Sequence, residues 1–262
     1  MADRVLVLDI ETLPDLAAGR ALLGADLPET ELRAALGARY ARDGQDPATA
    51  FLKPPLHRLA VLGVLRAERD APDEPFRVTQ CTARSIEEFD EPTLLARLDA
   101  LLAHGPLLVG FNTSGFDVPV LRYRALATGV PMPNLLGLGG RQYTHRYSAA
   151  HVDLCERLSG FRASTPPSLA EACALLGIPA KGGMTGLEVE PAIAAGRMAE
   201  VAAYCETDVA ATWLLWLRWM QATGAMPAEA ARDSMAAFAA WAAQDGRAHL
   251  APMGEAAGRL AL

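Results

Sequence analysis

Short apolar runs alternate with helical patterns along the chain. Residues 4–10, RVLVLDI, are rich in Val, Ile and Leu, which is typical of a strand buried on both faces. A second apolar run at 107–111 leads through polar residues into a helical pattern, and it predicts a strand, a turn and a helix. Residues 198–219 repeat their apolar positions at helical spacing. This alternation predicts an α/β protein.

Weaker patterns predict the remaining elements. The other expected strands are 57–66, 76–81 and 150–154, and the other expected helices are 86–103 and one that begins at Ser168. The segment between Leu13 and Pro55 is an insertion with a helical middle at 29–40. It either flanks a cleft or is a packing excursion without a role, and we favour the second interpretation.

Length and composition agree with one large domain. The 262 residues are 51% hydrophobic, so the chain can bury a sizeable core. No Gly-, Ser- or Pro-rich linker divides it. From Met226 onward, an Ala-rich run predicts an amphipathic helix that packs on the same chain or on a second copy, and the first is simpler. We therefore expect a domain over residues 1–225 and a helical extension over residues 226–262 packed on it.

The N-terminus and the cysteines favour a cytoplasmic protein. The start, MADRVLVLDIET, enters a strand at once and leaves no room for a signal peptide, and no stretch approaches the length of an uncharged transmembrane segment. The cysteines form no C-x-x-C pair and lie in apolar segments, so we expect buried, reduced thiols. They are Cys81, Cys155, Cys173 and Cys205.

Four carboxylates in three separated segments are candidates for chemistry. Side chains alternate along a strand, so Asp9 and Glu11 in VLVLDIET project to the same side. Asp117 in FNTSGFDVPVL lies where a helix should begin. Asp208 in YCETDV lies one helical turn after Tyr204, on the same face. Taken singly, each segment also has a structural explanation: a solvated strand end, a first-turn acid stabilised by the helix dipole, and a polar helix flank.

The joint occurrence of these acids favours a two-metal phosphodiesterase site. Hydrolysis of a phosphodiester needs a water that is nucleophilic near neutral pH and a stabilised leaving oxyanion, and two hard cations supply both. Mg²⁺ and Mn²⁺ prefer oxygen ligands and retain several waters. A site of Asp and Glu therefore suits both ions without choosing between them.

The same segments carry a family resemblance. DIET, N-x₄-D followed by P-x-L-x-x-R-A, and Y-C-x-x-D occur in this order, and the set resembles the DEDD (DnaQ-like) 3′-5′ exonuclease superfamily, in the subclass whose third motif carries Tyr. Over roughly residues 3–220, the chain is similar to the proofreading exonuclease domain of family B DNA polymerases and to stand-alone exonucleases related to that domain. The resemblance implies a ribonuclease H-like fold, with a mixed sheet of about five strands flanked by helices.

The resemblance also implies a role for each motif residue. Asp9, Glu11, Asp117 and Asp208 would bind two divalent cations, Mg²⁺ or Mn²⁺, with the scissile phosphate between them. Tyr204 would orient the attacking water or help to deprotonate it. Because a phenol with an ordinary pKa of about 10 is a poor base at neutral pH, we expect the metal to acidify the water and the phenol to aim it.

Further residues match positions that contact the terminal nucleotide in related enzymes. They are Thr12, Leu13, Asn112 and Phe116. Stacking on an aromatic ring tolerates any base, which suits an exonuclease. Phe116 is equally well placed to be a core residue beneath the helix start.

Two polar residues on the expected strand 150–154 lie near the same cleft. The set of four acids is complete without Asp153, so we expect this residue to have a structural hydrogen-bonding role. In the His-bearing subclass the histidine lies in the third motif, where Tyr204 stands here. We therefore do not expect His151 to be catalytic.

The net charge of −7 limits the nucleic-acid partners. The chain lacks the basic footprint of a protein that holds a long duplex, so single-stranded 3′ ends are the expected substrate. Basic residues that either guide a strand or are ordinary surface charges are Arg122, Arg124, Arg141, Arg146 and Lys181.

Three functions fit these observations. The first is a 3′-5′ exonuclease on single-stranded DNA, and the second is an exoribonuclease on short RNA. The two differ in how the surroundings of Thr12 and Asn112 accept a 2′-hydroxyl group. The third is a catalytically silent module that binds nucleic acid or protein. The presence of all four acids and of Tyr204 favours an enzyme.

Overall fold

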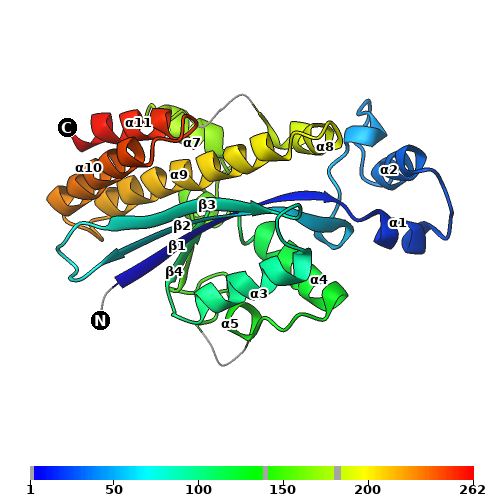
Figure 1. Ribbon diagram of the computed structural model, residues 1–262, viewed down its shortest axis with the longest axis horizontal. Coiled ribbons are helices and arrows are strands. Elements are labelled where there is room, and N and C mark those ends of the chain that lie inside the picture. Colours follow the sequence, from blue (N-terminus) through cyan, green and yellow to red (C-terminus); the bar gives the residue numbers. More distant parts are fainter. Residues whose placement is uncertain (1–2, 138–140, 180–183) are drawn as a thin grey trace.

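Strand β1 (Asp3–Pro14) lies at the centre of a five-stranded sheet in the computed structural model of the protein, which describes residues 3–137, 141–179 and 184–262 (Figure 1). The strand order is β3-β2-β1-β4-β5. The other strands are β2 (His57–Arg69), β3 (Arg77–Ser85), β4 (Leu107–Gly110) and β5 (His151–Asp153). Strand β2 is antiparallel to β1 and β3, whereas β4 is parallel to β1 and β5. The sheet is mixed, as the sequence predicts.

Alternating side chains of β1 enter two different cores. Val5 and Val7 join the core beneath the C-terminal helices, and Leu6 and Leu8 join the core on the opposite face. Because side chains alternate along a strand, Asp9 extends the row of Val5 and Val7. The apolar row therefore leads directly into the first predicted acid.

Helices cover both faces of the sheet, which confirms the α/β fold with flanking helices (Figure 1). One face carries α7 (Leu169–Leu175), α9 (Met198–Ala222), α10 (Ala228–Asp245) and α11 (Ala251–Ala261). The other face carries α3 (Glu91–Leu102), α4 (Asp117–Thr128) and α5 (Pro133–Leu136). The short helix α6 (Leu154–Leu158) follows β5, and α8 (Gly186–Ala194) precedes α9.

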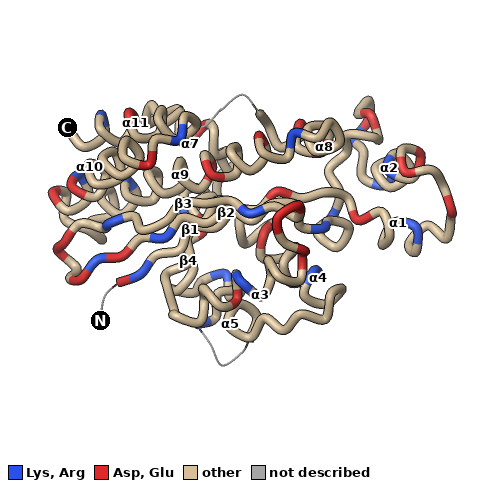
Figure 2. Tube along the Cα trace, viewed as in Figure 1, with Lys and Arg blue, Asp and Glu red and all other residues tan. Residues whose placement is uncertain are grey.

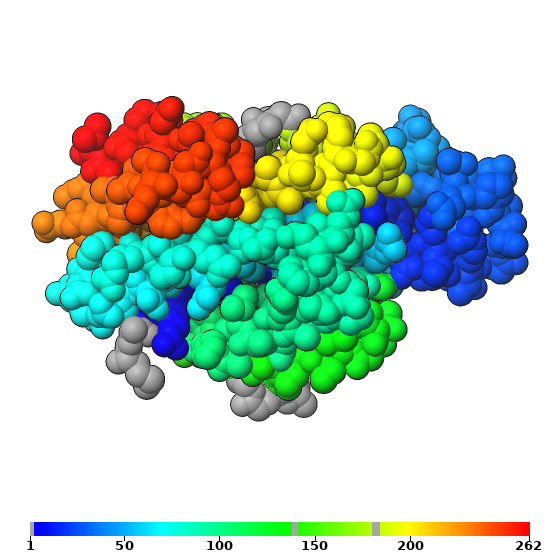
Figure 3. All heavy atoms as spheres, in the orientation of Figure 1, coloured from blue at the N-terminus to red at the C-terminus, as the bar shows by residue number. Residues whose placement is uncertain are grey.

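The insertion between β1 and β2 forms one end of the molecule, beside α8 (Figure 3). It contains α1 (Leu16–Leu23), α2 (Glu29–Ala38) and the 3₁₀ turns η1 (Pro47–Thr49) and η2 (Pro54–Leu56). The sequence predicts the helix at α2 but not α1, which begins where the Asp15 carboxylate accepts a hydrogen bond from the Ala18 N–H. An ion pair of 3.1 Å between Arg33 and Glu190 ties the insertion to α8.

The structure corrects two expected helices. The helix expected at 86–103 begins only at Glu91, because the Asp90 carboxylate accepts a hydrogen bond from the Thr93 N–H and caps the helix there. The C-terminal segment forms two helices instead of one. Gly246 ends α10 with a positive φ of 76°, a conformation that glycine adopts without strain.

The C-terminal helices pack on the rest of the chain. The Phe76 N–H, just before β3, donates a 2.9 Å hydrogen bond to Ser234 Oγ of α10. Met235 and Phe238 belong to the same core as Val5 of β1. One core thus runs from β1 to α11, and a domain boundary at residue 225 stays a prediction. Among the described residues, no helix has the length and hydrophobicity needed to cross a membrane.

Helix α9 approaches the sheet most closely where β2 has no side chain. Gly63 of β2 pairs with Asp9 of β1 and lies beneath Cys205 of α9. A Cβ atom at Gly63 would lie 2.5 Å from the Cys205 Sγ and 3.4 Å from the Cys205 carbonyl oxygen. The missing side chain therefore allows α9 to lie against the strand that carries the first acids.

We expect Gly63→Ala to destabilise the protein by about 1–3 kcal/mol, because the added methyl group overpacks this contact. The free energy of unfolding in urea would measure the change. The double variant Gly63→Ala, Cys205→Ala removes the clashing sulfur and should recover most of the loss. A single variant as stable as the wild type would show that this contact does not limit the position of α9.

Candidate active site

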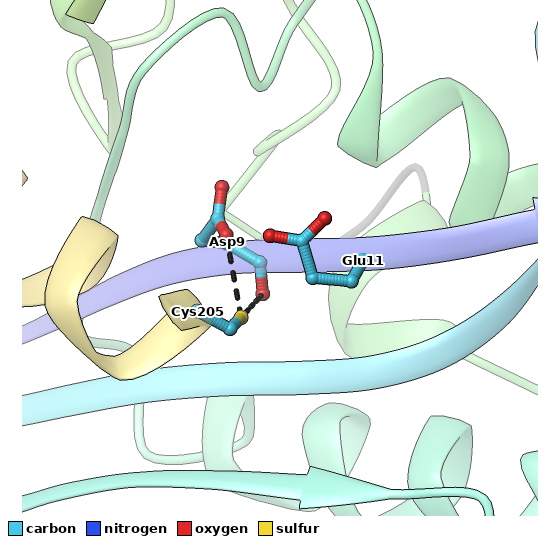
Figure 4. A group of neighbouring side chains, drawn as sticks. All are labelled: Asp9, Glu11 and Cys205. Atoms are coloured by element: carbon cyan, nitrogen blue, oxygen red, sulfur yellow. Dashed lines mark hydrogen bonds between the residues drawn. The ribbon is translucent and has the colours of Figure 1, made fainter. Parts of the chain in front are cut away.

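The four predicted acids meet beside the second half of β1. Asp9 and Glu11 lie on β1 itself, Asp117 lies on α4, and Asp208 lies on α9. Burial, and then repulsion from the other three carboxylates, raises the pKa of Asp9 well above its usual value. Burial, and then repulsion from Asp208 and Asp117, does the same to the pKa of Glu11. Figure 4 shows Asp9 and Glu11 as neighbours on β1, with Cys205 of α9 beside Asp9. The structure thus gathers acids from three distant segments.

Asp117 is held against β1 by a backbone hydrogen bond. Strand β4 pairs with β1 only at Val5–Val7, so farther along that edge the backbone has no strand partner. The Ile10 N–H there donates a 3.1 Å hydrogen bond to Asp117 Oδ1. Asp117 is the first residue of α4 and only 4% exposed. An ordinary acid in the first turn of a helix is solvated, whereas Asp117 is buried. Its position at the helix start alone therefore does not explain its surroundings.

Asp208 and Tyr204 lie side by side on α9, as their spacing predicts. The Asp208 Oδ1 atom is buried and has no hydrogen-bond partner among the described residues. Burial, and then the charge of Asp208, raises the pKa of Tyr204 above its usual value, so the phenol stays protonated at neutral pH. A protonated phenol donates a hydrogen bond and does not accept a proton, which agrees with a role in aiming a water.

The electrostatics of the cluster fit divalent cations. Burial raises the pKa of Asp117 to about 7, and burial also raises the pKa of Asp208 to about 7. Among the described residues no basic side chain perturbs the four carboxylates, and one of them has a buried oxygen without a partner. This is the oxygen-rich donor set that Mg²⁺ or Mn²⁺ prefers. A cation there would lower these pKa values by opposite charge and supply the missing partner of Asp208.

Cys205 is a member of the cluster that the sequence did not reveal. One oxygen each of Asp9 and Glu11 and the Cys205 sulfur lie within 4.8 Å of one another. The thiol donates a 3.3 Å hydrogen bond to Asp9 Oδ2 (Figure 4). Burial, and then the charge of Asp9, raises the pKa of Cys205 well above its usual value. The protonated thiol therefore orients Asp9, and the metal-binding set remains one of oxygens.

Two of the predicted nucleotide-binding residues lie in an aromatic cluster beside the acids. Thr12 Oγ1 and His57 Nδ1 form a 2.8 Å hydrogen bond. The rings of Phe116 and His57 are 5.1 Å apart, and those of Phe116 and Phe51 are 5.2 Å apart. Phe51 is 63% exposed and is supplied by the insertion. No sequence signal pointed to this contact, since Phe51 is far from the motifs, and the expectation that the insertion has no role stays a prediction.

A cavity of about 530 Å³ opens beside this aromatic cluster, between the insertion and α8. Thr12, Phe51 and His57 line it from one side, and Leu187 lines it from α8. Figure 3 shows the insertion and α8 adjacent at this end of the molecule. Leu13 lines a neighbouring cavity of about 450 Å³ instead. The structure therefore places Thr12 and Phe116 together and separates Leu13 from them.

Asn112 begins the turn between β4 and α4, and Asp153 holds this turn. The Asn112 N–H and the Ser114 N–H each donate a 2.8 Å hydrogen bond to the Asp153 carboxylate. Asp153 also accepts a hydrogen bond from the Cys155 N–H at 3.0 Å. Its predicted structural role is confirmed. His151 is buried, and its Nε2 lies 2.8 Å from Thr113 Oγ1, so it packs behind the same turn.

The basic residues named from the sequence have different surroundings. Arg124 is buried and pairs with Asp15 and Glu91, so its role is structural. Arg146 pairs with the buried Glu156. Arg122 and Arg141 are exposed, and Lys181 lies outside the described residues.

A comparison with protein families identifies proteins related to this chain. A family described as predicted 3′-5′ exonucleases related to the exonuclease domain of PolB matches residues 49–256. The chain belongs to this exonuclease family. By this description the chain is a predicted 3′-5′ exonuclease, which is a hydrolase. The match includes α10 and part of α11, beyond the range of about 3–220 over which the motifs indicate resemblance.

A solved structure agrees with the fold of this family. The family B DNA polymerase from the hyperthermophilic archaeon Pyrobaculum calidifontis matches with a TM-score of 0.52 and 19% sequence identity. The match covers 97% of this chain and 27% of the polymerase chain. A search of curated proteins found no match. The likeness supports the ribonuclease H-like fold of an exonuclease domain.

The raised pKa values predict how pH changes the stability of the metal-free protein. Asp117 and Asp208 hold their protons to a pH of about 7 in the folded state, whereas an unfolded Asp releases its proton at a pH of about 4. Between these values the unfolded state gains charge and the folded state does not, so stability falls as pH rises. In EDTA, we expect the melting temperature to be roughly 5–10 °C lower at pH 8 than at pH 5.

The variant Asp208→Asn serves as the matched comparison. It removes one titrating group and should reduce the pH dependence measured by calorimetry. Mn²⁺ at pH 8 should raise the melting temperature of the wild type by mass action, and raise that of the variant less. If the variant matched the wild type in both responses, Asp208 would not belong to the cluster.

Proposed function

We propose that the protein is a metal-dependent exonuclease that removes nucleotides from the 3′ end of single-stranded DNA by a two-metal mechanism. The observation that carries the proposal is the convergence of four carboxylates beside the second half of β1. Membership in a family of predicted 3′-5′ exonucleases supports it. The free, buried cysteines agree with a reducing compartment such as the cytoplasm.

Each acid has a defined part in this mechanism. Asp9, Glu11, Asp117 and Asp208 would hold the two cations, and the cations would supply the polarisation of the scissile phosphate and the acidification of water near neutral pH. The Ile10 N–H fixes Asp117, and the Cys205 thiol fixes Asp9, so these carboxylates keep their directions before substrate enters. Such preorganisation lowers the cost of reaching the transition state.

Tyr204 aims the attacking water. Its pKa is raised, so it keeps its proton and donates it in a hydrogen bond to Asp208, and the phenol oxygen would accept a hydrogen bond from the water. Tyr204 and Asp208 lie one turn apart on the same helix face, which supports a role for the phenol beside the proposed cations. We therefore assign it an orienting role.

The aromatic cluster receives the terminal nucleotide. Thr12, Asn112 and Phe116 border the acids, and Phe51 and His57 extend the ring surface toward the 530 Å³ cavity. A base stacks on such rings only when it is unpaired, which favours a single strand. Leu13 contributes through its backbone on β1, since its side chain lines the neighbouring cavity.

Short RNA is the alternative substrate. Thr12 Oγ1 already bonds to His57, so its hydroxyl group is partly engaged. A 2′-hydroxyl would have to displace or join this bond, which favours DNA. A silent binding module has no need for four crowded acids, because repulsion among them costs stability.

Digestion of matched 5′-labelled single-stranded DNA and RNA tests the proposal. With Mn²⁺ or Mg²⁺ we expect a ladder that shortens from the 3′ end, faster on DNA, and no cleavage in EDTA. Asp9→Ala and Asp208→Ala each remove several kcal/mol of transition-state stabilisation and should slow cleavage by at least about a hundredfold. Folded, metal-loaded protein that cleaves neither strand would favour the binding module.

Tyr204→Phe separates aiming from metal binding. It removes one hydroxyl group, and we expect kcat to fall by about 10- to 100-fold because the water loses its orientation. The affinity for Mn²⁺, measured by calorimetric titration, should stay close to that of the wild type. An unchanged kcat would remove Tyr204 from the mechanism.

A further inference from the structure

We propose that Arg162, supported by Arg146 and Tyr147, binds the phosphodiester backbone of the single strand next to the acid cluster. This inference rests on the proposed function and names the part of the surface that carries the strand beyond its terminal nucleotide. The three residues lie in the segments that flank β5 and α6. We call them, with Arg157 and Phe161, the β5-side patch.

A buried carboxylate organises the two arginines of this patch. Glu156 of α6 is 4% exposed and accepts a 2.7 Å hydrogen bond from Arg146 Nε and another from Arg162 Nε. The side chains of Arg146 and Arg162 remain about half exposed at their outer ends, at 44% and 51%. Glu156 therefore fixes both guanidinium groups through their Nε atoms. The terminal N–H groups of Arg162 remain available to other acceptors.

Arg162 reaches the turn that leads to Asp117. Its Nη2 lies 3.5 Å from Asn112 Oδ1, which is a long and weak contact. A Cβ atom at Gly115 would lie 3.3 Å from the same Nη2. The guanidinium group thus lies beside a residue proposed to contact the terminal nucleotide. Its Nη2 has only this long contact to Asn112 as an acceptor within the described part of the chain. A phosphate oxygen is the acceptor that this geometry fits best.

Backbone strain is concentrated at this contact. Asn112, Phe161 and Arg162 all have positive φ, at 59°, 57° and 71°. Residues other than glycine adopt this conformation uncommonly, although Asn does so more readily than most, and strained residues of this kind recur at ligand-binding sites. The loop after α6 therefore holds Arg162 near Asn112 at a cost in stability.

Aromatic rings complete the patch. Tyr147 is 61% exposed, and its ring lies 4.9 Å from that of Phe161. The Arg157 guanidinium lies 5.0 Å over the Phe161 ring. Proteins that bind single-stranded nucleic acids combine exposed aromatic rings with arginines, since bases stack on the rings and phosphates pair with the guanidinium groups.

The patch is locally basic on an acidic protein. Arg146 and Arg162 pair with the single carboxylate of Glu156, and Arg157 lies over the Phe161 ring. The neighbouring Asp153 is engaged by backbone N–H groups. Elsewhere, acidic and basic residues are interspersed along much of the chain (Figure 2). A strand that leaves the acids past Asn112 therefore meets positive charge next, which offsets the repulsion expected from a net charge of −7.

The test measures binding and turnover of Arg162→Ala. Binding of 5′-fluorescein oligothymidylates of two and eight nucleotides would be followed by fluorescence anisotropy in the Asp208→Ala background, where cleavage is blocked. We expect Arg162→Ala to weaken binding of the longer strand by about tenfold at low salt and to reduce the salt slope by about one phosphate contact. The loss should be smaller for the dinucleotide, and KM for the longer strand should rise more than kcat falls.

Arg77→Ala is the matched control. Arg77 is also half exposed, at 54%, and also pairs with a carboxylate at 2.7 Å, but it lies on β3 at the other edge of the sheet. It should leave binding unchanged. Arg162→Lys keeps the charge and should retain most of the affinity, which would separate phosphate binding from a folding defect. Glu156 keeps Arg146 as a partner in both Arg162 variants.

Three results would overturn the inference: equal losses for both lengths, a loss matched by Arg77→Ala, or no loss. Failure of the proposed function is distinct, because wild-type protein would then cleave no strand whether or not Arg162 affects binding.

Discussion

Burial of four carboxylates in one cluster is the constraint on which the rest of the structure depends. Burial and mutual repulsion both raise the pKa values of Asp9 and Glu11, so the cluster opposes folding when no cation is present. The opposing force comes from the far half of α9. Trp213 and Trp216 are fully buried there, in contact with Phe76 near β3. Burial of these apolar side chains therefore holds α9 in a position that the burial of Asp208, on the same helix, disfavours.

Helix α9 is fixed in rotation as well as in position. Two residues before Asp208, Glu206 accepts a 2.8 Å hydrogen bond from the Ala83 N–H and pairs with Arg247 at 2.7 Å. Positions two apart on a helix point in nearly opposite directions. Glu206 thus binds β3 and the connection between α10 and α11, while Asp208 faces the other acids. Through these contacts the C-terminal segment contributes to the geometry of the site, although it lies outside the motifs.

The sequence revealed those parts of the site that are local. Hydrophobic runs located the strands, and motif spacing located Asp9, Asp117 and Asp208. Both signals are local, because each depends on the periodicity of a single strand or helix. Phe51, Cys205 and Arg162 could not be found in this way. Their importance comes from neighbours distant in the chain, such as Phe116, Asp9 and Asn112. The start of α3 was misplaced since Asp90 caps a helix whose hydrophobic pattern extends farther back.

The acids of this site come from opposite ends of the chain. Asp9 lies on the first strand, and Asp208 lies on a helix that docks only against a sheet already containing β2 and β4. Contacts of such long sequence separation form late in folding, because loop closure must come first. A chain that has folded without α9 therefore lacks Tyr204 and Asp208 of the candidate site. The proposed cleavage activity thus requires a chain folded through α9, and it cannot precede the long-range contacts that the fold itself needs.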